Sequence, residues 1–258
     1  MRRLVSSVFL LVFAILPGSA QTSLPGDTTS QIDKLVTETL TRTGVPSASV
    51  AIVKDGAVAY VKTYGDAKLE PKTPATTAMR YSIGSISKQF TASAILLLQE
   101  QGKLSLDDKV AKYIPDLTRA NEVTIRQLLS HTSGYQDYWP QDYVMKPMLE
   151  PITARKIMDT WAKKPLDFEP GTKWQYSNTN YVIAGAIVEK VARMPFFKFL
   201  QQKIFTPLGM TSVTDIDQEL LKASDPIGYK RYALGPLRVA PKEGKGWLFA
   251  AGQLAMTA

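Results

Sequence analysis

The segment YSIGSISKQFTASAILLLQEQG, from Tyr81 to Gly102, places a serine and a lysine three residues apart at the front of an apolar stretch. Side chains three residues apart on a helix share one face, with Cβ atoms about 5 to 6 Å apart, so the Lys88 amine can reach the Ser85 hydroxyl. Serine is a poor nucleophile near neutral pH until a base takes its proton. Burial and the positive end of a helix both lower the pKa of a lysine. Ser85 and Lys88 are therefore a candidate nucleophile and base.

The position of Lys88 also breaks a local rule. The first turn of a helix prefers Asp or Glu, and a cation there costs a few tenths of a kcal/mol, on the order of 0.3. If Ser85 only capped the helix, Glu or Gln at position 88 would complete a capping box. A residue that goes against such a structural preference without a local stabilising contact favours a functional site at that position. However, a chain of this length contains about one Ser-x-x-Lys by chance, so the motif alone is weak.

A second motif, Tyr176-Ser177-Asn178, stands in a loop just before a predicted helix. A tyrosine hydroxyl can relay a proton, and a carboxamide can bind a substrate carbonyl. Taken alone, the better interpretations are a packed surface aromatic for Tyr176 and a helix cap for Asn178. The pairing with Ser85 and Lys88 shifts the balance toward chemistry.

Hydrophobic spacing and turn residues predict the elements that would position these side chains. The predicted helices span 32–40, 90–98, 181–192 and 196–205, with short helical pieces in 105–117 and 124–134. Two strands should form a hairpin at Asp55-Gly56, a pair that favours tight turns. The helix at 90–98 is apolar or small nearly all round, so it should be buried, with Gly102 as its stop.

The composition excludes several classes of site. The 258 residues are 45% hydrophobic and 21% charged, as in a soluble globular protein of one or two domains. The sequence has no Cys and a single His, His131. Zinc sites usually need two or three imidazoles or thiolates, and a Ser-His-Asp triad would have to use His131 without a G-x-S-x-G elbow. We therefore expect no metal, no cofactor and a base other than histidine.

The charge of +8 gives no nucleic-acid signature, because the lysines are scattered. Attraction to anionic cell-wall polymer remains an alternative to a simply solvated surface. The sequence gives no indication of an oligomeric state.

The first residues, MRRLVSSVFLLVFAILPGSAQTS, combine a basic tip, a short apolar run and small residues before Gln21. This pattern is typical of a signal peptide, predicted here as residues 1–20. The apolar run is shorter than the roughly 20 residues that span a bilayer. We expect export to the periplasm or extracellular space, with no stable membrane anchor after cleavage.

The two motifs, in this order, resemble those of the serine β-lactamase and penicillin-binding-protein superfamily, specifically its class C β-lactamase-like branch, where Tyr-x-Asn replaces Ser-Asp-Asn. The resemblance runs from about Gln31 to Ala258. The sequence segments that carry the resemblance are YSIGSISKQFTA, LLSHTSGY, FEPGTKWQYSN, IFTPLGM and AAGQLAMTA. It implies an α+β fold in which a helical domain is inserted into an α/β domain with an antiparallel sheet, the site lying at the junction.

By this resemblance, Ser85 is the nucleophile and Lys88 its activating partner. Tyr176 is the proton relay, and Asn178 binds the substrate amide. His131 belongs to a structural SHTSG turn and is not a catalyst.

The family's third element, Lys-Thr-Gly or His-x-Gly, has no counterpart after Tyr176. We therefore expect 21–258 to be a partial β-lactamase-like serine hydrolase domain that lacks the C-terminal strands. The sheet should be incomplete, with an unpaired edge near strands such as those around Ile52 and Tyr60. One of two oxyanion donors would also be missing, and losing one typically costs about 10² to 10³ in rate.

The leading hypothesis is an exported serine hydrolase that forms an acyl-enzyme with a small molecule or cell-wall peptide. The substrate is a β-lactam, a D-amino-acid peptide or a small ester. The alternative is a non-catalytic cell-wall or β-lactam-binding module, or an inactive fragment of a longer hydrolase. Four aromatic side chains in 134–143 pack that loop onto the helical domain or stack against the acyl donor: Tyr135, Tyr138, Trp139 and Tyr143.

Overall fold

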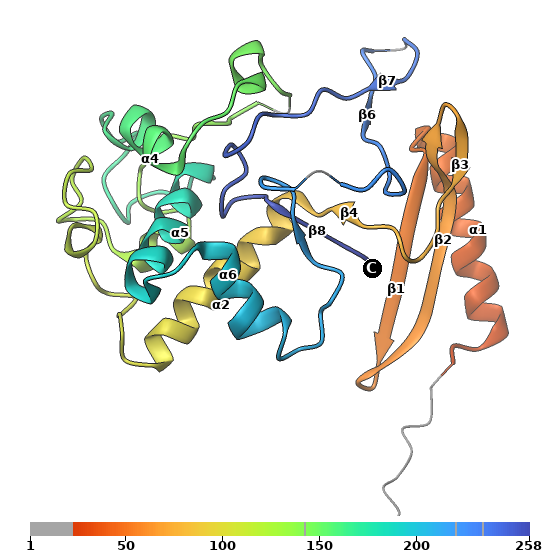
Figure 1. Ribbon diagram of the computed structural model, residues 1–258, viewed down its shortest axis with the longest axis horizontal. Coiled ribbons are helices and arrows are strands. Elements are labelled where there is room, and N and C mark those ends of the chain that lie inside the picture. The colour runs from red at the N-terminus through yellow and green to blue at the C-terminus, as the bar shows by residue number, and fades with distance from the viewer. Residues whose placement is uncertain (1–22, 142, 220, 234) are drawn as a thin grey trace, which may run out of the picture.

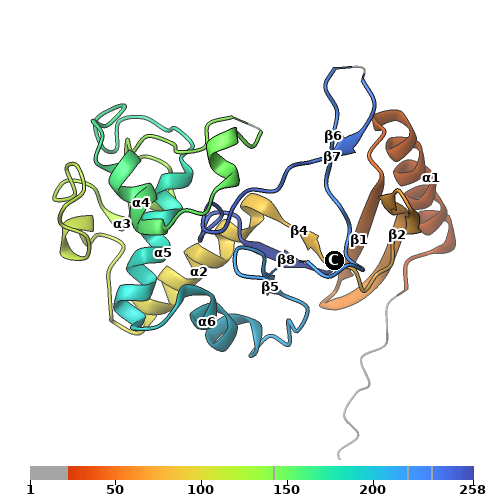
Figure 2. The ribbon, with the colours of Figure 1, turned by 45° about the horizontal axis from the view of Figure 1, so that its top comes forward.

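The computed structural model describes residues 23–141, 143–219, 221–233 and 235–258. The predicted signal peptide, residues 1–20, lies outside the described residues. Most helices gather at one end of the molecule, α1 and a long hairpin lie at the other, and short strands run between them (Figure 1). The turned view in Figure 2 shows the same division.

Six α-helices and eight strands make up the described chain. The helices are α1 (Gly26–Thr43), α2 (Ser87–Glu100), α3 (Ile125–Leu129), α4 (Ala154–Ile157), α5 (Asn178–Ala192) and α6 (Phe196–Leu200). Short 3-10 turns span Gly84–Ile86, Val110–Lys112 and Lys146–Leu149, and π-helical turns continue α4 at Met158–Ala162 and α6 at Gln201–Phe205. The strands are β1 (Ser47–Lys54), β2 (Ala57–Leu69), β3 (Lys72–Pro74), β4 (Tyr81–Ser82), β5 (Thr214–Asp215), β6 (Tyr229–Lys230), β7 (Arg238–Val239) and β8 (Leu254–Met256).

The N-terminal unit is α1 packed on the β1–β2 hairpin. The predicted helix at 32–40 and the predicted hairpin at Asp55-Gly56 are both confirmed. Asp55 and Gly56 have φ of 52° and 76°, the left-handed pair that a tight two-residue hairpin turn requires. On α1, the Asp33 carboxylate accepts hydrogen bonds from the hydroxyls of Tyr60 and Tyr64 on β2 at 2.8 and 2.6 Å. These bonds fix the helix against the hairpin.

Every described strand ladder is antiparallel, as expected, but the strands form three small sheets rather than one. The orders are β1-β2-β3, β4-β8-β5 and β6-β7. Within the described ranges β1 pairs only with β2, so the unpaired edge expected near Ile52 is present. The small β4-β8-β5 sheet lies beside the start of α2 (Figure 1).

The helical core forms around α2 and α5, which pack against each other. Ile95 and Leu98 on α2 and Ile183 and Ile187 on α5 are fully buried. The prediction that α2 is buried nearly all round is wrong at Leu96, whose side chain is 44% exposed. The helix instead has one solvent-facing stripe, as a helix at the edge of a core does.

A segment far along the chain, 246–252, lies against both central helices. A Cβ atom added to Gly185 of α5 would stand 2.4 Å from Ala250 Cβ, so only glycine permits this approach. On α2, the Thr91 hydroxyl donates to the Ala250 carbonyl at 2.7 Å. The segment is thereby held beside the first turn of α2.

No helix in the described part of the chain is long and apolar enough to cross a bilayer.

Candidate active site

Ser85 and Lys88 meet as the spacing predicts. Ser85 lies in the 3-10 turn that precedes α2, and Lys88 is the second residue of that helix. The Lys88 Nζ lies 3.1 Å from the Ser85 Oγ. No side-chain cap forms at the start of either helical segment, so the interpretation of Ser85 as only a helix cap is wrong.

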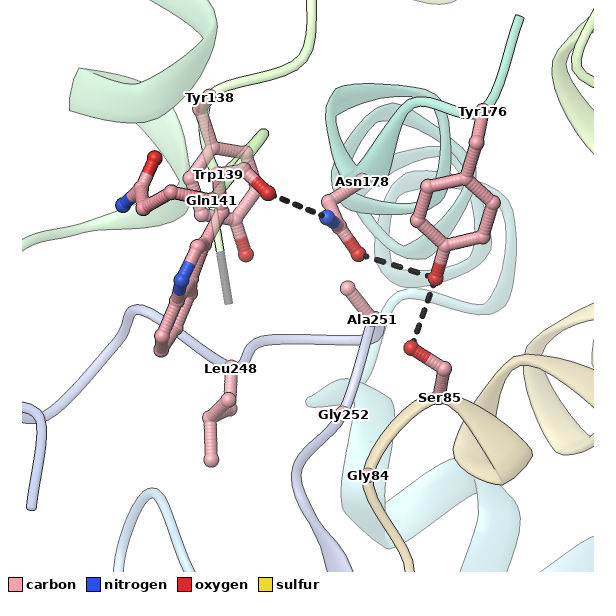
Figure 3. Close-up of a pocket in the computed structure, with 10 residues that line it drawn as sticks. All are labelled: Gly84, Ser85, Tyr138, Trp139, Gln141, Tyr176, Asn178, Leu248, Ala251 and Gly252. Atoms are coloured by element: carbon pink, nitrogen blue, oxygen red, sulfur yellow. Dashed lines mark hydrogen bonds between the residues drawn. The ribbon is translucent and has the colours of Figure 1, made fainter. Parts of the chain in front are cut away.

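The loop before α5 brings the second motif to the same point. The Tyr176 hydroxyl lies 2.7 Å from the Ser85 Oγ, and Asn178 is the first residue of α5. The Asn178 Oδ1 accepts from Lys88 Nζ at 2.8 Å and from the Tyr176 hydroxyl at 3.4 Å. Figure 3 shows the Asn178, Tyr176 and Ser85 side chains converging from two elements. All four predicted site residues therefore come together.

Lys88 is almost completely buried, with 6% of its surface exposed. Burial lowers its pKa to about 8, and the negative charge of Asp137 opposes that change. A third contact of Nζ, at 2.7 Å, is the backbone carbonyl of Ala251 in the 246–252 segment. The position of Lys88 at a helix N-terminus adds to the destabilisation of its charged form. The unfavourable placement seen in the sequence thus favours the neutral amine of Lys88.

The pKa of Tyr176 is raised by burial, with the hydrogen bond to Ser85 acting in the opposite direction and the charge of Asp137 adding to the increase. Its side chain is 36% exposed and borders the cavity. At neutral pH its side chain is therefore a phenol.

His131 packs against Tyr176 and binds the backbone of the next residue. Its ring centroid lies 4.6 Å from that of Tyr176, and its Nδ1 accepts a hydrogen bond from the Ser177 N–H at 3.1 Å. Burial and the nearby Lys88 lower the pKa of His131 to about 4, so the ring is neutral at physiological pH. This arrangement agrees with the structural turn that the resemblance implies.

Two contacts of the site were not predicted. Asp137 accepts hydrogen bonds from the backbone and side-chain amides of Asn178, at 2.9 and 3.2 Å. The signal for Asp137 in the sequence is an acid inside the aromatic stretch GYQDYWPQDY. The Ala251 contact uses a backbone carbonyl, which leaves no residue-type signal in a sequence.

A cavity of about 470 Å³ opens in front of Ser85. Its walls include Trp139, Gln141 and Leu248, together with Tyr176 and Asn178 (Figure 3). Across the described ranges, no group of three or more His, Cys, Asp or Glu side chains is arranged to hold a metal ion.

The aromatic loop packs onto the helical core, as one of the two interpretations predicts. Tyr135 and Tyr138 are each 2% exposed and pack the loop onto the helical core. Trp139 lines the cavity. Tyr143 is 63% exposed.

The sequence is similar to a family profile and to several known proteins. A family profile described as "Beta-lactamase" matches residues 32–258. "Protein flp" of Staphylococcus aureus (strain N315) is 33% identical over 229 residues, which cover 86% of this chain and 45% of that protein. "Penicillin-binding protein 4*" of Bacillus subtilis (strain 168) is 34% identical over 191 residues, covering 73% of this chain and 41% of the relative. The chain thus spans less than half the length of these curated relatives.

Among solved structures, a D-amino acid amidase from Ochrobactrum anthropi SV3 in complex with D-phenylalanine is similar, with a TM-score of 0.82 and 27% identity. The match covers 90% of this chain and 68% of the amidase. It confirms the expected β-lactamase/transpeptidase-like fold class.

Proposed function

This chain belongs to the β-lactamase family of serine hydrolases and penicillin-binding proteins, and from that premise we propose that it acts through an acyl-enzyme formed on Ser85. The observation that carries the proposal is the hydrogen-bonded group of Ser85, Lys88 and Tyr176 at the edge of a cavity. A nucleophile within 3.1 Å of a buried amine and 2.7 Å of a phenol has two routes for its proton.

Burial favours the neutral amine of Lys88, and its contacts orient that amine as a base. The Asn178 Oδ1 and the Ala251 carbonyl can only accept, so each takes one N–H of Lys88. A neutral amine has two hydrogens and one lone pair. With both hydrogens committed, the lone pair is left for the Ser85 hydroxyl, which then donates to it.

The reaction proceeds from this arrangement in two stages. The Ser85 Oγ attacks the substrate carbonyl carbon while its proton passes to Lys88, and the Ser85 N–H stabilises the developing oxyanion. The bond to the leaving amine or alkoxide breaks as Tyr176 relays the proton to it. Water then attacks the acyl-enzyme, gives up a proton through the same groups, and releases the acid with free Ser85.

Small amides and esters of D-amino acids are the proposed substrates, alongside β-lactams and D-amino-acid peptides of the cell wall. The support is the similarity to a D-amino acid amidase and to a penicillin-binding protein, together with a cavity wall that includes Trp139 and Leu248. Initial rates on a D-amino acid amide, its L enantiomer, a nitrophenyl ester and a chromogenic cephalosporin rank these classes. Faster turnover of the L than of the D amide would overturn the assignment.

The first test is the intact mass of the purified protein after treatment with a fluorophosphonate. The Ser85 Oγ should displace fluoride from phosphorus and give one covalent adduct. Ser85→Ala should give none, whereas Ser93→Ala, a change at an exposed serine of α2, should react like the unaltered protein. Absence of an adduct on protein that unfolds cooperatively would overturn the proposal.

The same variants separate hydrolysis from the alternative, a non-catalytic cell-wall or β-lactam-binding module. Such a module would bind a penicillin saturably with or without the Ser85 hydroxyl, and no covalent mass would appear. Acylation instead predicts a stable penicilloyl adduct that requires Ser85.

We also propose that the protein is exported to the periplasm or cell exterior, on the evidence of the sequence pattern in residues 1–20. Expression of the full chain in a bacterial host should give a mature form that begins at Gln21 in the periplasmic or culture fraction. A product retained in the cytoplasm with its first 20 residues would contradict this.

A further inference from the structure

Asp137 and Lys88 lie on opposite sides of the Asn178 side chain, Asp137 at its nitrogen and Lys88 at its oxygen. Its Oδ1 accepts from the backbone N–H of Asn178 at 2.9 Å and from the Trp139 N–H at 3.1 Å. The Asn178 Nδ2 lies 3.2 Å from both oxygens of the carboxylate and 3.4 Å from the Trp139 carbonyl (Figure 3 shows the last contact). The side-chain amide of Asn178 thus has acceptors on its nitrogen side.

The orientation of the Asn178 carboxamide decides what Lys88 can do. With the present orientation, Oδ1 accepts a hydrogen from Lys88. In the neutral amine this leaves the lone pair for the Ser85 hydroxyl, whose Oγ lies 3.1 Å from Nζ. With the amide reversed, its N–H groups would donate to that lone pair and consume the base. The reversed amide would also place Oδ1 against the Asp137 carboxylate, where neither group has a hydrogen to donate. The carboxylate therefore excludes the unproductive orientation.

We propose that Asp137 is a positioning residue that locks the Asn178 carboxamide with its oxygen toward Lys88, so that the amine lone pair remains directed at Ser85. This inference rests on the proposed acyl-transfer function and adds to it a residue that does not touch the substrate in the chemical step.

The same carboxylate adjusts the charge around Lys88. The titratable side chains that face this amine are Tyr176, Tyr181, His131 and Asp137, and Tyr181 and Tyr176 present their rings within 5.5 Å of Nζ. The tyrosines and His131 are neutral near pH 7. Asp137 is the group in this set whose charge raises the pKa of Lys88. Loss of the carboxylate should lower that pKa further.

The test uses Asp137→Asn, Asp137→Ala, Asn178→Ala and the double variant Asp137→Ala/Asn178→Ala. Asp107→Asn is the matched control, since it removes one carboxylate from an exposed ion pair with Arg126. Two quantities are measured: the second-order rate of fluorophosphonate labelling from pH 5 to 10, and the Lys88 pKa from the ¹³Cε chemical shift. Urea unfolding of each variant reports whether the fold is retained.

Asp137→Ala should slow labelling on the order of 10²-fold, the scale of a misplaced catalytic group. In both Asp137 variants, the rising limb of the pH profile and the ¹³Cε titration should move to lower pH. In the double variant, labelling should be no slower than in Asn178→Ala, because Asp137 acts through Asn178. Asp107→Asn should match the unaltered protein.

The proposal would be overturned if Asp137→Ala slowed labelling equally in the presence and absence of Asn178. It would also be overturned if the Asp137 variants changed neither the labelling rate nor the Lys88 titration. A lower unfolding free energy with no movement of the pH limb would assign a merely structural role. The ¹³Cε measurement does not require activity, so it still tests the Asp137–Lys88 coupling if Ser85 proves unreactive. Failure of the proposed function itself would appear instead as an absence of labelling in the unaltered protein.

Discussion

At the scale of the residue, the site is built around one buried lysine. Its pKa of about 8 leaves about a tenth of the molecules with a neutral Lys88 at pH 7. Three oxygen atoms surround the amine, and the two carbonyl oxygens among them cannot donate a hydrogen. In the proposed mechanism, activation of the Ser85 nucleophile is therefore linked directly to the protonation state of Lys88.

The pH dependence of acylation follows from this lysine. Because the lowered pKa belongs to the folded site, the labelling rate should rise with pH and level off above about pH 8. Lys88→Arg keeps a charge that does not dissociate near neutral pH and should slow labelling by about 10² to 10⁴, the usual contribution of a general base. Stopped-flow or timed mass measurements across pH 5 to 10 check both results. A flat profile in the unaltered protein would assign the base elsewhere.

At the scale of the element, two helices and one distant segment form the site. The 3-10 turn Gly84–Ile86 supplies Ser85, the first turn of α2 supplies Lys88, the start of α5 supplies Asn178, and the 246–252 segment supplies the Ala251 carbonyl. Gly185 allows that segment to approach α5, and the Thr91 hydroxyl holds it to α2. The contact between these elements therefore controls the burial of Lys88.

Gly185→Ala should disturb that contact. The added methyl would stand 2.4 Å from Ala250 Cβ and 2.9 Å from the Phe249 ring, so the segment must shift. Overpacking of this kind typically costs about 1 to 3 kcal/mol, and the shift should also slow fluorophosphonate labelling. Gly26→Ala, at the exposed start of α1 with open space around it, is the control and should leave both quantities unchanged. Urea unfolding and the labelling rate measure the two effects; an unaffected Gly185→Ala protein would show that the approach is not required.

At the scale of the whole molecule, local signals were predictable and long-range ones were not. The helix pattern, the Asp55-Gly56 turn and the Ser85–Lys88 pair depend on residues close in sequence, and all three are present. The role of Asp137 depends on a contact across 41 residues with Asn178, which no local periodicity encodes. The separation of the strands into three sheets has the same origin, because strand partners are chosen by tertiary packing.

Stability of the whole fold should also depend on a buried acidic pair, Asp215 and Asp217. Burial raises their pKa values to about 6 and about 7, and Asp217 accepts a hydrogen bond from the Leu248 N–H. The folded protein therefore binds more protons than the unfolded chain between about pH 4 and pH 7, so their contribution to the unfolding free energy falls as pH rises through that window. His131, with its lowered pKa, contributes in the opposite direction between about pH 4 and 6.5.

Asp217→Asn isolates the acidic contribution, because the amide stays neutral at every pH and its oxygen still accepts from Leu248. The unfolding free energy of the variant should equal that of the unaltered protein near pH 4 and exceed it by about 2 to 4 kcal/mol at pH 7.5. Urea unfolding at the two pH values measures the difference. The Asp107→Asn protein serves as the comparison for loss of an exposed carboxylate. Equal stabilities of Asp217→Asn and the unaltered protein at pH 7.5 would contradict the assignment.

The bond between Lys88 and Ala251 joins residues 163 positions apart, and this separation has a consequence during synthesis. A ribosome adds about 5 to 20 residues per second, so roughly 10 to 30 seconds pass between the translation of the two residues. Throughout that interval Lys88 lacks one of the three oxygen atoms that its amine contacts in the folded protein. If Ser85 acts as the proposed nucleophile, its site is therefore complete only when the 246–252 segment has joined the fold.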